Sequence, residues 1–278
     1  MSKEAKPACF KKPACFTGRA MTAMLACACA VAPVAAHDAA AQTDGMEVAD
    51  PAPIDPVAIA ALDQMAAYLQ TLVSFRVRAD ATTEVVLEGG QKIQFGGDID
   101  LAVHRPDAFK VVSEADTRTR EMYYNGGTFT IFAPRLGYYA SFDAPPTIGQ
   151  TLDVARTKYG IEVPLADLFT WGTDQTIRAR VQEAMVILPE TIGDRQCVHY
   201  AFRQENVDWQ LWLEEGPEPL PCKIVITSKD DPAMPQYTSV LHWDLSEPVP
   251  ADSLAFNPPA DAHRITIAEV EDAMGDDQ

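Results

Sequence analysis

Few side chains in this sequence are of a type and spacing that could carry out chemistry. The motif Gly-x-Ser-x-Gly, which presents a nucleophilic serine on a sharp turn, is absent. The five histidines are scattered and form no His-x-x-x-His pair suited to a metal ion: His37, His104, His199, His242 and His263. Two of them, His199 and His242, fall on expected strands and could meet across a sheet, a pattern more typical of an ordinary sheet face than of a metal site. The sequence therefore predicts a protein that is not an enzyme and that uses no metal ion or other cofactor.

The overall charge narrows the classes of binding partner. Acidic residues outnumber basic ones by 40 to 22, which gives the 278-residue chain a formal net charge of −18. Nucleic acids and anionic membrane surfaces are bound through an excess of Lys and Arg, so the composition argues against both. Apolar residues make up 47% of the chain, which is enough to bury a sizeable core.

The first 36 residues have the composition of a signal peptide. Five basic residues precede an uncharged apolar stretch, Met21–Ala36, which is too short to span a bilayer comfortably. Small residues allow cleavage after Ala36, or as late as Ala41. We therefore expect export to the periplasm. The alternative is a lipoprotein anchored at Cys27, because Met24–Cys27 loosely resembles a lipobox.

The rest of the chain has the pattern of one mainly β domain (α+β), over residues 56–268. A Pro- and Asp-rich linker, 42–55, precedes an amphipathic helix over 56–71, and an acidic tail follows from 269 to 278. Period-two alternation predicts six strands, beginning with a long hairpin over 75–103. Two helices over 148–159 and 164–171 interrupt the strands, and the pattern resumes in five further strands with a final short one over 254–256.

This order of elements favours a particular fold class. Consecutive hairpins without β-α-β alternation predict a single curved antiparallel sheet, which forms an open half-barrel covered by about three lid helices. A plain β-sandwich is the alternative. Apolar rows lie on the strands and on the last helix, and they form either a packed core or the lining of a cavity: Phe95, Ile99, Leu101, Phe129, Ile131, Leu168, Phe169, Trp171, Trp209 and Leu211.

The two cysteines beyond the leader, Cys197 and Cys222, lie on expected strands that flank a third one. Strands in that relation are about 9–10 Å apart, which is beyond the reach of a disulfide. We therefore expect two reduced thiols. A disulfide stays open as the alternative, because the register of these strands is not defined by the sequence.

Four motifs follow one another in an order that resembles a known superfamily. They are Leu72–Phe75, Phe95–Ile99 leading into Arg105–Phe109, Tyr124–Pro134, and Phe256–Pro259. Together they are similar to the lipoprotein carriers, the periplasmic LolA/LolB-like half-barrels. More narrowly, Pro134–Tyr139, Tyr159–Ile161 and Leu165–Phe169 resemble a branch of uncharacterised predicted periplasmic proteins, for which no activity is implied.

The resemblance implies a hydrophobic cavity, between the curved sheet and the lid helices, that receives acyl chains. It also implies that Arg105, in the Arg-Pro motif, holds the lid shut by bonding to helix backbone; the alternative is that Arg105 caps a surface turn. We therefore expect a monomeric, non-catalytic periplasmic protein that binds lipid or a lipoprotein acyl chain. An envelope sensor that binds an inner- or outer-membrane protein is the second hypothesis, and an envelope lipid hydrolase is the third.

Overall fold

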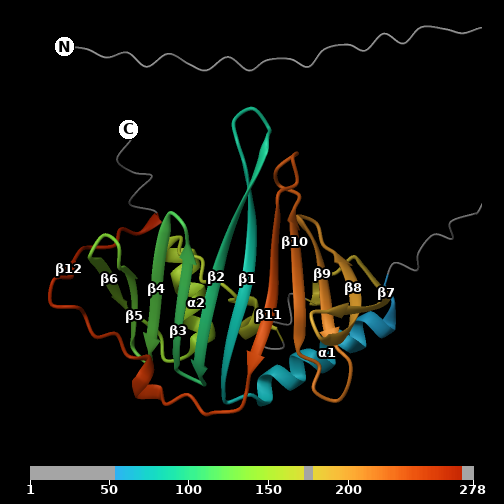
Figure 1. Ribbon diagram of the computed structural model, residues 1–278, viewed down its shortest axis with the longest axis horizontal. Helices are drawn as coiled ribbons and strands as arrows, with labels where there is room; N and C mark the ends of the chain where they lie inside the picture. The colour runs from blue at the N-terminus through green and yellow to red at the C-terminus, as the bar shows by residue number, and fades with distance from the viewer. Residues whose placement is uncertain (1–53, 172–177, 271–278) are drawn as a thin grey trace, which may run out of the picture. The chain divides into compact units, whose positions relative to one another are not determined.

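The computed structural model of the chain describes residues 54–171 and 178–270 (Figure 1). Its three α-helices are α1 (Pro56–Thr71), α2 (Ile148–Tyr159) and α3 (Asp167–Thr170). Six strands lie between α1 and α2: β1 (Ser74–Val86), β2 (Lys92–His104), β3 (Ala108–Ala115), β4 (Arg118–Asn125), β5 (Thr128–Ala133) and β6 (Tyr138–Asp143). Six follow α3: β7 (Glu183–Ile192), β8 (Arg195–Arg203), β9 (Val207–Glu214), β10 (Pro221–Ser228), β11 (Gln236–Asp244) and β12 (His263–Arg264).

In the described residues these strands form one open curved sheet, in the order β12-β6-β5-β4-β3-β2-β1-β11-β10-β9-β8-β7. All neighbouring strands are antiparallel except β12, which runs parallel to β6. We call the sheet face that packs against the helices the inner face, and the opposite one the outer face. Buried side chains of all three helices join the inner-face core, and α2 lies behind β2 and β3 in Figure 1. The predicted fold class, a single antiparallel sheet covered by three helices, is confirmed.

The long hairpin extends beyond its neighbours. Strand β1 pairs with β11 only over Arg76–Thr83, and β2 pairs with β3 only over Asp98–His104. Residues 84–94 therefore form a two-stranded segment without lateral strands, and residues 95–97 lack one on the β3 side only; we call 84–97 the free ribbon. Figure 1 shows it projecting past the ends of the adjacent strands.

Helix α1 begins with a well-formed N-cap. The Asp55 side chain accepts a hydrogen bond of 2.8 Å from the Val57 amide, and Pro56 supplies a backbone angle that suits the first turn. Asp55→Ala is expected to lower the free energy of unfolding by about 1 kcal/mol, because that amide loses its acceptor. Asp55→Asn retains a capping oxygen and serves as the control. Equal denaturant midpoints for the two variants would contradict this role.

Three boundaries differ from the sequence prediction. The segment 42–55, expected to be a linker, includes Ile54 and Asp55, which contact Ala184 of β7; residues 42–53 lie outside the described ranges, as does the expected signal peptide. The predicted strand over 254–256 is wrong. Its first residue ends a 3-10 helix, Ala251–Leu254, because Ser253 bonds back to Pro250 in a tight turn. The sequence does not predict strand β12, because a strand of two residues is too short to show an alternation of apolar and polar side chains.

The expectation of reduced cysteines is also wrong, because Cys197 and Cys222 form a disulfide. Strands β8 and β10 do flank β9, but their Cα atoms at the two cysteines are only 6.7 Å apart. Cys197 lies opposite Glu214, the last residue of β9, and the register of β10 shifts by a bulge between Pro221 and Lys223. A bulge bends its strand and re-aims the side chain, so the two sulfur atoms meet at the end of β9.

Candidate functional site

The inner face is an apolar surface covered by helices. Eight of the ten residues predicted to line a core or cavity are buried in a single cluster: Ile99, Leu101, Phe129, Leu168, Phe169, Trp171, Trp209 and Leu211. Ile131 is half-buried and packs against this cluster. These side chains contact one another between sheet and helices, so an acyl chain would enter only by displacing part of this packing.

Phe95 is the exception among the predicted residues. It lies on the same face of β2 as Ile99 and Leu101, but it is 53% exposed. Its register partner is Thr83, the last residue of β1 that pairs with β11, so Phe95 lies at the base of the free ribbon. Phe95 shares the face of the buried row but is not part of the buried cluster, so a packed-core position is wrong for this residue, and its role as a cavity residue stays a prediction.

Arg105 joins the sheet to helix α3. It follows β2 directly, and its Nη2 donates a hydrogen bond of 3.4 Å to the Leu168 carbonyl of α3. Its guanidinium also lies 5.5 Å from the centre of the Phe169 ring and 6.0 Å from that of Phe75 on β1. Burial lowers the pKa of Arg105, and its Nε is buried without a partner. The resemblance implied a bond from this arginine to helix backbone, and the structure contains one; that it holds a lid shut stays a prediction.

Helix α2 is tied to the same end of the sheet. The Ile148 amide donates to the Pro106 carbonyl at 3.1 Å, next to Arg105 in the chain. The Pro145 carbonyl accepts bonds from the Tyr124 hydroxyl at 2.6 Å and from the Thr151 hydroxyl at 3.1 Å. Burial raises the pKa of Tyr124, which keeps this hydroxyl a donor. Sequence reasoning missed Tyr124, whose position in a strand pattern predicts burial but not its long-range partner.

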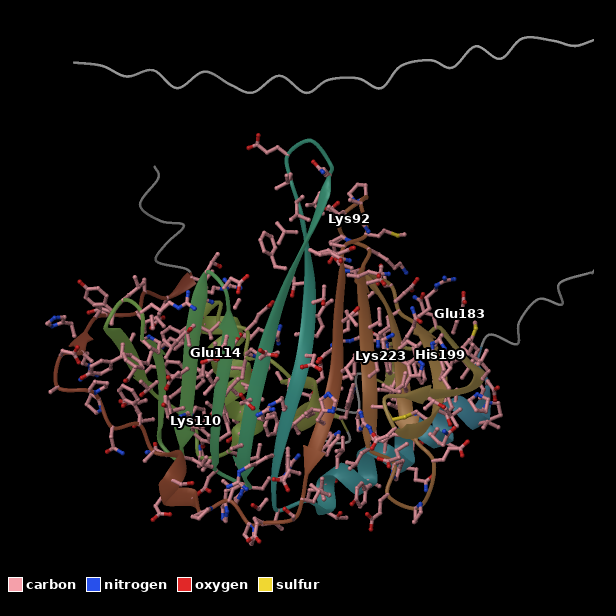
Figure 2. The ribbon with its side chains drawn as sticks, in the orientation of Figure 1. Lys92, Lys110, Glu114, Glu183, His199 and Lys223 are labelled. Atoms are coloured by element: carbon pink, nitrogen blue, oxygen red, sulfur yellow. A yellow bond between two sulfur atoms is a disulfide. The ribbon has the colours of Figure 1, made fainter. Side chains whose placement is uncertain are left out.

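The strand histidines do not meet. On the outer face, His199 stacks on Trp212 with ring centres 3.9 Å apart, and Lys223 lies over the same indole at 4.5 Å (Figure 2). His199 bonds to Glu190 and Gln210, whereas His242 bonds to Asp80. Within residues 54–171 and 178–270, no group of three or more His, Cys, Asp or Glu side chains is placed to hold a metal ion.

Two hollows in the described residues are lined by charged and apolar side chains together, and Trp243 lines both. One has a volume of about 560 Å³ and includes Arg195 and Glu214; the other has about 460 Å³ and includes Arg78 and Asp100. His242 lines both of them. These hollows therefore mix charged and apolar groups and do not form a purely apolar site. The largest buried apolar cluster of the described residues lies on the inner face.

Residues 58–268 match a family model described as "Predicted periplasmic protein (DUF2092)". No curated protein matches the chain. Among solved structures, it is similar to lipoprotein LppX of Mycobacterium tuberculosis, with 15% identity, a TM-score of 0.44, and coverage of 71% of this chain and 100% of that one. A LolA superfamily protein of Nitrosomonas europaea is 12% identical, with a TM-score of 0.37 and coverage of 72% and 97%. The MucA/MucB complex of Pseudomonas aeruginosa is 14% identical, with a TM-score of 0.40 and coverage of 76% of this chain and 64% of that one.

Proposed function

The chain belongs to the DUF2092 family of predicted periplasmic proteins, and we propose that it is a periplasmic, non-catalytic protein that binds lipid or lipoprotein acyl chains at its inner face. The observation that carries this proposal is the contact of Arg105 with the backbone of α3. Helix α3 is only four residues long and covers the apolar sheet with Leu168 and Phe169, so it is a suitable lid. The binding role needs no catalytic group.

The proposed mechanism is an exchange of apolar contacts. When α3 lifts, the side chains of Leu168 and Phe169 leave the inner-face cluster, and an acyl chain takes their place against the sheet. Burial of the chain contributes about 0.8 kcal/mol per methylene, so a long acyl chain can compensate for the lost packing. The bonds from Arg105 to α3 and from Tyr124 to Pro145 then favour the closed state.

Native mass spectrometry tests this function on protein purified from the periplasm without detergent. We expect a reproducible adduct with the mass of a lipid, which organic extraction releases and identifies. A protein without adduct that co-purifies with a stable protein partner would contradict the proposal. That result would favour the second hypothesis. In it, a protein of this same fold is an envelope sensor that binds a protein partner.

A further inference from the structure

The free ribbon presents an apolar face that has no partner in the described residues. Val85 pairs with Ile93 and Thr83 with Phe95, so these side chains point to one face. By alternation these side chains share a face with Ile99, although Gly97, between the two, lies against the Glu114 backbone. Phe95 is 53% exposed, and Leu87, just beyond β1, is 47% exposed. Exposed apolar side chains that gather on one face are typical of a surface that binds a protein, a membrane or a ligand.

The ribbon is held in a defined position despite its lack of lateral strands. An isolated two-stranded hairpin is marginally stable in water. Here the Glu84 carboxylate forms an ion pair with Lys92 at 2.9 Å, across the hairpin, and accepts a bond of 2.9 Å from the Gln236 amide at the start of β11. Figure 2 labels Lys92 in this projecting hairpin. The apolar tip is thus presented by polar contacts at its base.

The adjacent hairpin presents a further exposed apolar side chain. Met234, in the loop between β10 and β11, is 51% exposed. This loop lies beside the free ribbon and projects at the same end of the sheet (Figure 1). Two separate loops present apolar side chains at one end of the sheet. A partner with a broad, deformable surface can contact both loops at once, whereas a partner with a single narrow groove cannot.

Charge indicates the kind of surface. Of the three charged residues between 84 and 92, Glu84 and Lys92 neutralise each other, and Glu88 remains. The tip therefore has no basic cluster, and the chain has a net charge of −18, which opposes an anionic membrane. We propose that the free ribbon, with Leu87 and Phe95 at its apolar face, docks this protein on a zwitterionic lipid bilayer. Docking stands independently of the proposed cargo.

Vesicle flotation tests the proposal on full-length protein recovered from the periplasm. The probe is vesicles of phosphatidylcholine and phosphatidylethanolamine, with a second set containing phosphatidylglycerol. We expect the wild-type protein to float with the zwitterionic vesicles, equally at low and high salt, and less with the anionic set. The double variant Leu87→Ser/Phe95→Ser should reduce the bound fraction about tenfold, because two apolar side chains no longer enter the bilayer.

Leu188→Ser is the matched control, since Leu188 on β7 is 49% exposed and lies at the far edge of the sheet. It should float like the wild type, and circular dichroism should show the same fold in all three proteins. The proposal is overturned if the wild type does not float, if the double variant floats equally, or if binding requires anionic lipid and disappears in salt. It is also overturned if sedimentation shows a wild-type dimer, without flotation, that the double variant abolishes. A lipid adduct in the mass spectrum of a protein that does not float would retain the binding function and reject only the docking.

Discussion

Removal of the Cys197–Cys222 disulfide is expected to lower the free energy of unfolding by about 3 kcal/mol. The two cysteines are 25 residues apart, so the bond closes a loop that contains all of β9. Cross-linking such a loop restricts the unfolded chain, and its loss lets the unfolded state gain entropy. The double variant Cys197→Ala/Cys222→Ala tests this by chemical denaturation. Alanine is chosen because both sulfur atoms are buried beside Trp212 and Val225, where a serine hydroxyl would need a new partner.

A reducing agent supplies the control. It should lower the denaturation midpoint of the wild-type protein to that of the double variant, and it should leave the double variant unchanged. The periplasm is an oxidising compartment in which such a bond persists. A wild-type protein whose midpoint does not respond to reductant, and which equals the double variant, would show that the bond does not stabilise this fold.

Much of the fold could be predicted because its signals are local. Most strands alternate apolar and polar residues, and turn residues such as Asn125-Gly126-Gly127 separate one strand from the next. That pattern determines the strand, its inner face and the antiparallel succession. The family match confirms the resemblance to predicted periplasmic proteins, which was based on Pro134–Tyr139, Tyr159–Ile161 and Leu165–Phe169.

The errors concern properties that depend on distant neighbours. Alternation assigns Phe95 to the inner face, but its exposure depends on where β3, β11 and the helices end. The spacing of Cys197 and Cys222 depends on a bulge in β10, and no residue type near Pro221 marks that bulge uniquely. Likewise β12 exists because a C-terminal segment returns to the edge of β6, which is a tertiary contact without a local period.

Arg105→Leu is expected to reduce the amount of lipid retained per protein about tenfold, which corresponds to about 1.4 kcal/mol of lost closed-state stability. The variant removes the bond to the Leu168 carbonyl and the guanidinium contacts with Phe75 and Phe169. Overall folding stability should change little. The guanidinium has no carboxylate within ion-pair distance in the described residues, and replacing a poorly compensated buried charge by an apolar side chain is often neutral. The variant should therefore destabilise the closed position of the lid and leave the free energy of unfolding nearly unchanged.

Two measurements distinguish an arginine that holds the lid shut from one with a merely structural role. Lipid extracted from equal amounts of protein reports retention, and hydrogen exchange in α3 reports lid opening even when no lipid is bound. Arg78→Leu is the matched control, because Arg78 on the outer face pairs with Asp100 and does not contact α3. It should leave both readouts at wild-type values, while Arg105→Leu accelerates exchange in α3 and loses lipid. If Arg105→Leu retains as much lipid as Arg78→Leu and exchanges α3 amides at the same rate, Arg105 does not hold the lid. The inner face would then have to be closed by its apolar packing and by the bonds that tie α2 to Pro106 and Tyr124.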